Sequence, residues 1–250
     1  MRYTEHYEVS SHDVDTNNYI RPSLLQRYLI ETADHQMRDR KPTYYELFVE
    51  GKAFILTRIS IEYYGQISKY DRIDVQTWRC PEKGATFIRC FTVFKEGKLM
   101  AKGYSVWAVV NHRTGKLCRA SEVDISGYET EEPHRMQLPD RFRLPKDIEY
   151  IHVGNKKVFL GETDINGHMN NTYYADILWS FIPDVLQKTV TSVNLRFQHE
   201  ALLGEEMEVF MGRMKEPLAE DEQADETWCF YSKVNGQINI EAEIGVKHIL

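Results

Sequence analysis

The sequence predicts an α+β fold made of two tandem copies of one plan, in which an antiparallel sheet wraps around a long helix. In each half of the chain, a segment with helical periodicity precedes several segments with strand character, which favours a sheet packed on that helix. Short motifs of the first half recur in the same order in the second, as expected of an internal repeat. With 250 residues, 42% of them hydrophobic, the chain can form one large domain or two small ones that share a core.

In the first half, a short strand is expected over residues 3–11, followed by a polar turn. Pro22 is expected to open a helix, because its missing N–H group is harmless at a first helical position. This helix should end near residues 35–37, and a second, short helix should span residues 44–50 and be closed by Gly51. Turn residues then separate four expected strands, at residues 54–64, 72–78, 86–95 and 99–111.

A segment of weak periodicity, residues 119–150, connects the two halves. It reads as a long linker, ordered in part by packing, between an N-terminal unit at residues 1–118 and a C-terminal unit at residues 151–250. In the C-terminal unit a helix is expected over residues 172–186, with an apolar stripe on one face. Strands are expected at residues 157–161, 190–197, 206–214, 227–234 and 238–246.

Composition narrows the classes of function. The formal net charge is −7 without a long basic run, which argues against nucleic acid as a partner, because phosphate binding needs clustered positive charge. The four scattered cysteines lack the paired spacing of metal sites, so no metal or other cofactor is implied. The chain shows no apolar signal core at its N-terminus and no apolar run of about 18 residues. We therefore expect a soluble cytoplasmic protein that does not bind membranes.

One stretch, residues 163–174, concentrates polar side chains just before the second predicted helix. Asp164, Asn166 and His168 stand at every second position, and Asn170 and Asn171 follow. So many hydrogen-bonding groups are costly unless something uses them. A helix cap containing a satisfied histidine is the structural alternative, and the motif alone does not separate it from a catalytic site.

Three pairs of segments carry the repeat, and one of them joins residues 73–75 to residues 207–209. Residues 13–17 (DVDTN) align with residues 164–168 (DINGH) at an offset of 151. Residues 59–63 align with residues 193–197 at an offset of 134. Their recurrence in the same order favours two halves of one supersecondary plan.

The two copies differ where proton transfer is concerned. His168 corresponds to Asn17 in the first copy, and Glu200 corresponds to Gln66. Only the second half can therefore exchange protons near neutral pH, which favours a catalytic pair over a purely structural one. Strand alternation places Glu200 on the face away from the core, unless the strand ends or bulges before it.

At this point the sequence resembles the fatty acyl-ACP thioesterases of bacteria and plants. The motif Asp164-Ile165-Asn166-Gly167-His168-Met169-Asn170-Asn171-Thr172-Tyr173-Tyr174 carries the likeness, with family-like segments at residues 56–59, 75–78 and 105–114. The resemblance covers residues 3–246. It implies a tandem (double) hotdog fold and hydrolysis of the thioester that joins a fatty acyl group to the 4′-phosphopantetheine of acyl carrier protein.

The resemblance, with the residue chemistry, implies a division of roles. Glu200, expected to be desolvated, acts as general base on a water molecule that His168 orients. Asn166 positions the water or the thioester carbonyl, and Asp164 holds the segment in place. Backbone N–H groups around Asn170 and Asn171 are expected to stabilise the oxyanion.

The resemblance also places the acyl-chain pocket in the first half. Its candidate lining residues, each of which could equally be ordinary core, are Leu25, Leu29, Phe48, Phe54 and Trp107. Plant members carry a cysteine after the glutamate matched by Glu200, where this chain has Ala201, so a cysteine nucleophile is excluded there. Docking of the acidic carrier should use a local basic patch, with Lys156, Lys157, Arg141, Arg143 and Lys146 as candidates.

Three alternatives remain open. An acyl-CoA thioesterase of the same fold would differ in the carrier and not in the chemistry. A hotdog hydratase or dehydratase would need an acid in the central helix, where this chain offers only Asp176 and Asp184. A non-catalytic acyl-binding protein would retain acyl chains without releasing fatty acid. Because two units in one chain can pair with each other, a monomer and a homodimer are both expected possibilities.

Overall fold

The computed structural model describes residues 2–138, 143–218 and 223–249. The first half contains the helices α1 (Pro22–Asp39) and α2 (Tyr44–Val49) and the strands β1 (Tyr3–Glu8), β2 (Lys52–Tyr63), β3 (Arg72–Arg79), β4 (Thr86–Lys95), β5 (Lys98–Asn111) and β6 (Lys116–Leu117). The second half contains the helix α3 (Tyr173–Trp179) and the strands β7 (Ile151–Lys157), β8 (Lys188–Phe197), β9 (Glu206–Arg213), β10 (Glu226–Val234) and β11 (Gln237–His248). Three short 3₁₀ helices complete the described elements, η1 (Ala120–Glu122), η2 (Leu160–Glu162) and η3 (Val185–Gln187).

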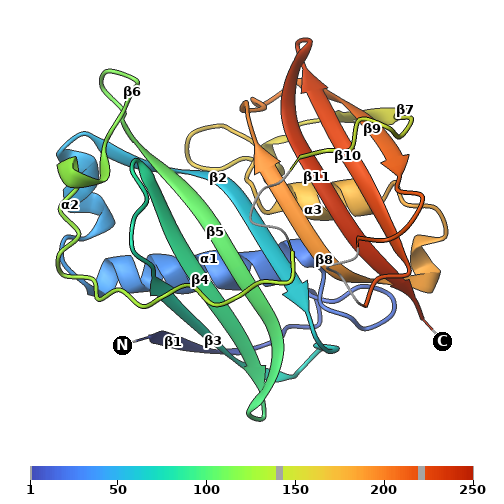
Figure 1. Cartoon of the computed structure of the whole chain (residues 1–250), viewed down its shortest axis with the longest axis horizontal. Coiled ribbons are helices and arrows are strands. Elements are labelled where there is room, and N and C mark those ends of the chain that lie inside the picture. Colours follow the sequence, from blue (N-terminus) through green and yellow to red (C-terminus); the bar gives the residue numbers. More distant parts are fainter. Residues whose placement is uncertain (1, 139–142, 219–222, 250) are drawn as a thin grey trace.

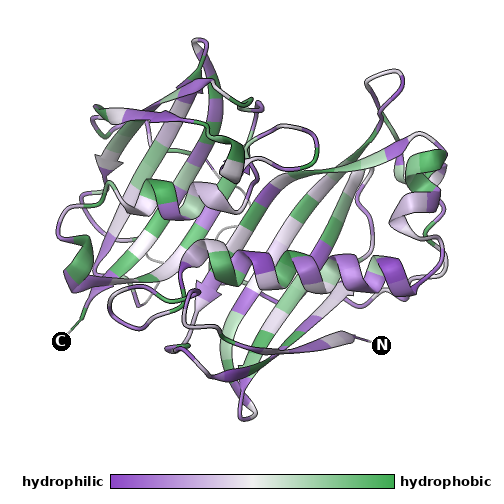
Figure 2. Ribbon diagram, turned by 180° about the vertical axis from the view of Figure 1, so that it is seen from behind, coloured by the Kyte–Doolittle hydropathy of each residue, from purple (hydrophilic) through white to green (hydrophobic). Residues whose placement is uncertain are grey.

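The strands form one continuous antiparallel sheet. In the described residues its order is β1-β3-β4-β5-β2-β8-β11-β10-β9-β7, and β6 pairs with β5. Figure 1 shows this sheet crossing the whole molecule, and Figure 2 shows α1 and α3 on one face of it, over strands whose hydropathy alternates along their length. The predicted α+β class, a large antiparallel sheet with few helices, is confirmed.

The helix α1 is positioned by its apolar stripe. Pro22 occupies the start of the helix as predicted, and Leu25, Leu29 and Ala33 recur at a spacing of one turn on the face that packs against the sheet. Both leucines are fully buried, and each contributes about 2 kcal/mol by leaving water. The helix continues to Asp39, beyond the predicted end.

The predicted helix over residues 172–186 is too long, and only the first half is therefore built on a long helix. The helix α3 ends at Trp179. Pro183 cannot donate a helical hydrogen bond and disfavours helical geometry in the residue before it. Asp184 then adopts a left-handed conformation with φ of 53°, after which η3 leads directly into β8.

The strand predicted at residues 157–161 is also wrong, because β7 lies at residues 151–157 and the chain leaves the sheet after Lys157. Among the described residues, β7 pairs with β9 alone, at the edge of the sheet, and its side chains are exposed or half-buried. An edge strand of this kind needs little apolar alternation, which is the pattern on which the prediction relied.

The two halves meet where β2 pairs with β8. Ser60 lies opposite Asn194 and Glu62 opposite Ser192, while Arg58 lies opposite Arg196. Ser60 and Asn194 are also equivalent under the repeat offset of 134, so a local two-fold axis passes between them, and the Ser60 hydroxyl bonds the Asn194 side chain at 2.8 Å. The offset found in the sequence therefore agrees with the way that the halves pair.

The linker packs on the first half. Val123, Ile125 and Tyr128 are buried in a cluster with Leu47 and Phe87. Further along, the amide of Leu138 donates to the carboxylate of Glu62 at 2.7 Å. This part of the linker therefore closes one side of the first half.

A second contact joins the helices of the two halves. The Asp176 carboxylate in α3 accepts hydrogen bonds from the backbone N–H of Ser23, at 2.9 Å, and from its hydroxyl. Asp176 thus caps the first turn of α1, whose N–H groups have no partner within the helix.

Candidate active site

The loop between η2 and α3 is shaped by one carboxylate. The Asp164 side chain accepts from the backbone N–H of Asn166 at 2.8 Å and of His168 at 3.1 Å, and its own N–H donates to the His168 carbonyl at 2.8 Å. Gly167 takes a φ of +78°, which glycine adopts without strain. Asp164 therefore sets the conformation that presents His168.

The end of β8 brings Glu200 to this loop. The amides of Gln198 and His199 both donate to the carbonyl of Asn239, at 2.9 and 3.2 Å, so two residues face one and the alternation of the strand is broken. Met169 N–H then bonds the Ala201 carbonyl at 2.8 Å. The strand thus ends before Glu200, as its placement beside the loop requires.

The two predicted proton-transfer groups lie together. His168 Nε2 is 3.4 Å from Glu200 Oε2, and the side chains are 29% and 63% exposed, respectively. Such a distance is common in a free enzyme whose hydrogen bonds tighten only with substrate. The expected desolvation of Glu200 is wrong for the free chain. Two exposed apolar residues lie close to the pair in sequence, Ile165 before His168 and Leu202 after Glu200.

A buried amide that the sequence prediction missed fixes this geometry. Asn239, in β11, donates to the His199 carbonyl and, at 3.1 Å, to the Tyr174 hydroxyl, and its oxygen accepts from Ser232 Oγ at 2.9 Å. It is fully buried. No sequence signal marked it, because a polar residue that alternates with apolar ones in a strand ordinarily faces solvent.

The remaining polar residues of the motif divide into two groups. Asn166 is exposed, and within the part of the chain that the structure describes its side chain makes one hydrogen bond, of 3.4 Å, to Asp164. Asn170 N–H already donates to the Glu162 carbonyl at 2.8 Å, so the expectation that it serves an oxyanion is wrong. The Asn170 side chain bonds Thr172 instead, while the Asn171 carbonyl accepts from Gln26 of α1 at 3.3 Å. Both asparagines therefore anchor the loop, and the expected role of the Asn171 N–H at an oxyanion stays a prediction.

A cavity of about 760 Å³ lies in the first half, between the second half of α1 and the strands. Phe54 and Trp107 line it as predicted. Leu25 and Leu29 do not, because they are fully buried in the main core. Phe48 is on the surface, where it stacks on His112 with ring centroids 4.3 Å apart.

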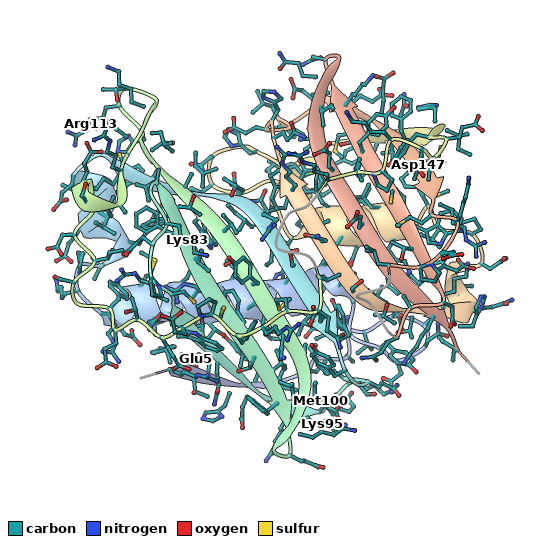
Figure 3. The ribbon with its side chains drawn as sticks, viewed as in Figure 1. Glu5, Lys83, Lys95, Met100, Arg113 and Asp147 are labelled. Atoms are coloured by element: carbon teal, nitrogen blue, oxygen red, sulfur yellow. The ribbon has the colours of Figure 1, made fainter. Side chains whose placement is uncertain are left out.

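A second, open hollow of about 790 Å³ lies over the β2–β8 seam and reaches His199. Its walls carry Arg58, Lys83 and Arg196, and no carboxylate lines it within the described ranges. Figure 3 shows Lys83 close to the strands of the first half. Arg196 also pairs with Glu241 at 3.0 Å. We call this hollow, with its three cationic side chains, the basic groove. Ile88 lines both the basic groove and the cavity, so a single residue separates the two hollows.

Comparison with known proteins decides the family. A model of the acyl-ACP thioesterase N-terminal domain matches residues 1–128, and a model of the C-terminal domain matches residues 147–247. The chain belongs to the acyl-ACP thioesterase family. A curated relative, the chloroplastic palmitoyl-acyl carrier protein thioesterase of Cuphea hookeriana, is 21% identical over 222 residues, which cover 79% of this chain. The chain spans about half the length of that relative, 51%.

Solved structures share the fold. An acyl-ACP thioesterase from Bacteroides thetaiotaomicron matches with a TM-score of 0.85 and 22% identity, covering 98% of both chains. A putative oleoyl thioesterase from Lactobacillus plantarum also reaches 0.85, at 17% identity, covering 100% of this chain and 96% of the other. The 12:0-ACP thioesterase of Umbellularia californica reaches 0.81 at 14% identity, covering 99% and 94%.

The cysteines, the possible metal ligands and the helices of this acyl-ACP thioesterase family member were each compared with the expectations from sequence. Its four cysteines are all buried, and Ala201 fills the position next to Glu200. Among the described residues, no group of three or more His, Cys, Asp or Glu could hold a metal ion. No helix within the described ranges is long and apolar enough to span a membrane.

The predicted basic patch is weaker than its composition suggested. Lys156 pairs with Glu162 at 2.6 Å, so part of its charge is neutralised. Lys157, Arg143 and Lys146 are exposed. Arg141 lies outside the described residues.

One ionisable group in the cavity wall should make stability depend on pH. Although the Asp34 side chain is open to solvent on one side, the protein atoms packed around its carboxyl, with repulsion from Glu31, raise its pKa to about 6, against the opposing effect of Arg89 and His35. A carboxyl whose pKa is higher in the folded state binds more protons there, so stability falls as pH rises from about 4 to about 6. We expect Asp34→Asn to increase the free energy of unfolding at pH 8 and to leave it unchanged at pH 3.5. Urea titrations at both values measure this; an equal effect at both would contradict it.

Proposed function

We propose that the chain hydrolyses the thioester of a fatty acyl group carried by acyl carrier protein and releases free fatty acid. The observation that carries this proposal is the approach of His168 to Glu200, at 3.4 Å, in a loop whose shape Asp164 imposes. Membership of the acyl-ACP thioesterase family supports it. We also propose that the fold is a double hotdog, with the acyl cavity in residues 1–118, a linker at 119–150 and the catalytic residues in 151–250.

The proposed first step is attack by water. The Glu200 carboxylate removes a proton from a water molecule that His168 also contacts, and the water oxygen bonds to the thioester carbon. The carbonyl electron pair moves onto oxygen. Because the Asn170 N–H already bonds the Glu162 carbonyl, the proposed donors to this oxyanion are the exposed side-chain amide of Asn166 and the Asn171 N–H.

The second step breaks the carbon–sulfur bond. The oxyanion electrons return to form the carboxyl group, the thiolate leaves, and the proton held by Glu200 passes to the released products. A thiolate needs little protonation to leave, so the pair needs no strong acid. Bound acyl chain, together with exposed Ile165 and Leu202, would exclude bulk water from Glu200 and strengthen its action as a base.

The same proposal gives a path to the 4′-phosphopantetheine arm of the carrier. The basic groove ends at His199, the residue before Glu200, and carries three cationic side chains. Phosphate esters are attracted to such groups. A phosphate-bearing arm in this groove would deliver its terminal sulfur toward Glu200 while the acyl chain enters the cavity beside Ile88.

Hydrolysis of matched acyl-ACP and acyl-CoA substrates tests the carrier. We expect a higher kcat/KM for acyl-ACP, and a large preference for acyl-CoA would favour the acyl-CoA thioesterase instead. A non-catalytic acyl-binding protein would release no fatty acid from either. Expression in cells that make acyl-ACP, followed by fatty acid profiling, gives an independent measurement.

A hydratase or dehydratase is disfavoured by the position of its required acid. Asp176 is the acid within α3, and both of its carboxylate oxygens bond Ser23 at the start of α1. Asp184 lies beyond the end of that helix. Neither is placed to work with His168.

A further inference from the structure

The cavity in the first half carries two charged side chains that do not pair with each other. Arg89 is 9% exposed, and its guanidinium donates only to neutral acceptors, the Gln36 side chain and, at 3.2 Å, the Thr77 hydroxyl. Asp34 lines the same cavity and is exposed to solvent in the free chain. In the described parts of the chain, neither group has an opposite charge within 4.0 Å, and Asp34 accepts no hydrogen bond.

Neighbouring charges do not relieve Arg89. Arg79 lies directly opposite it in the β3–β4 pairing, an arrangement that is unfavourable for like charges. Arg79 is itself occupied with the carbonyls of Ile125 and Tyr128, at 3.0 and 3.1 Å, and with Glu82. A buried charge without an oppositely charged partner is costly. The Arg89 side chain in the cavity wall therefore favours a polar ligand.

An unsubstituted hydrocarbon chain in the cavity would increase the free-energy cost of leaving these charges without partners. It would displace the water that solvates Asp34 and Arg89 and would supply no hydrogen bond to either. A hydroxyl group can meet both needs, because it donates one hydrogen bond and accepts another. Placed between the two side chains, it would donate to the Asp34 carboxylate and accept from the Arg89 guanidinium.

We propose that the cavity takes an acyl chain bearing a hydroxyl group, held between Asp34 and Arg89. This inference rests on the proposed thioesterase function. Residues of α1 from Ile30 onward line the cavity. The first turn of that helix lies at its other end and contacts α3 through Ser23. The hydroxyl therefore lies in the part of the chain nearer its methyl end, away from the thioester.

The same wall disfavours a carboxylate at that end of the chain. Such a group would be attracted by Arg89 but would meet the charges of Asp34 and Glu31, which both line the cavity. His35 offers little compensation, because it lies 3.1 Å from each of the carboxylates of Glu5 and Glu31. A neutral hydroxyl avoids this repulsion.

Competing substrates of equal length test the proposal. Acyl-ACP with a hydroxyl on its terminal carbon should show a kcat/KM about ten- to a hundredfold higher than the unsubstituted chain, as expected when a site's polar groups would otherwise be left unpaired. Asp34→Leu should abolish or reverse this preference. Met37→Leu, an apolar exchange in the same cavity wall, should preserve it.

Binding to an inactive variant separates this inference from the proposed function. Calorimetry with Glu200→Gln should give tighter binding of the terminal hydroxy fatty acid than of the plain acid, and Asp34→Leu added to that variant should remove the difference. If the chain bound the hydroxy acid tightly but hydrolysed no thioester, only the proposed function would fail. Equal binding of both acids, or a stronger preference for a dicarboxylic acid, would overturn the hydroxyl assignment.

Discussion

Replacing Glu200 with Gln should lower kcat by about a hundred- to ten-thousandfold, the range that general-base catalysis contributes. Gln keeps the size of the side chain and its contact with His168 but cannot accept the proton of the attacking water. KM should change little, because the side chain acts on water rather than on the acyl chain. Steady-state hydrolysis of acyl-ACP, with circular dichroism to establish folding, measures the effect.

The repeat supplies a matched control for this substitution. Gln66 is the counterpart of Glu200 in the first half and is exposed, so Gln66→Ala should leave kcat unchanged. His168→Ala should also lower kcat strongly, and combining it with Glu200→Gln should add little, because the two groups act on one water molecule. Near-normal turnover in both folded single variants would show that the site lies elsewhere.

Replacing Glu226 with Leu should lower the free energy of unfolding by about 3–5 kcal/mol, because it leaves a buried cation without its partner. Lys188 Nζ lies 2.8 Å from Glu226, and the side chains are 4% and 8% exposed. Trp228 also donates to this carboxylate at 2.8 Å, and Arg213 approaches it at 3.3 Å. One carboxylate therefore serves several donors around the start of β10.

The same group should contribute to sensitivity toward acid. Burial acts to raise the pKa of Glu226, but hydrogen bonds from Lys188 and Trp228 outweigh it and hold the pKa below its ordinary value. The contribution of Glu226 to the free energy of unfolding is therefore fully present above the pKa that this carboxyl has in the unfolded chain, and it is lost as the pH falls. Urea titration at pH 7 and pH 4 should show a smaller cost of Glu226→Leu at the lower pH. Exposed Glu208→Gln serves as the control and should change stability by less than about 0.5 kcal/mol.

How much could be predicted depended on whether a feature was local. The start of α1 at Pro22 and the β4 strand followed from short-range signals, and both were confirmed. The length of α3 was wrong because the apolar stripe continues past Trp179, although Pro183 interrupts the backbone. The position of the edge strand β7 was predicted wrongly, because the side chains of an edge strand need not alternate between apolar and polar.

In the candidate site, the motif and the internal repeat together predicted which groups would meet, but not what holds or surrounds them. His168 and Glu200 were predicted as a pair, and the structure brings them together. Asn239 comes from a strand about 40 residues beyond Glu200 and carries no sign of burial in its local pattern. Asp34 and Arg89 face one cavity only after α1 has packed on β4, so neither could be assigned to the cavity from sequence spacing.

The peptide chain between β6 and β7 covalently joins two halves that are, in pattern, a symmetric pair, and the β2–β8 seam pairs their sheets. Partners joined in this way have no dissociation constant, and dilution cannot separate the half with the cavity from the half with His168. Fusion also frees each half from keeping the other's residues: a substitution in a symmetric dimer appears twice, whereas here it appears once. Asn17 can therefore occupy the position that corresponds to His168, so that one half alone carries the proposed catalytic pair.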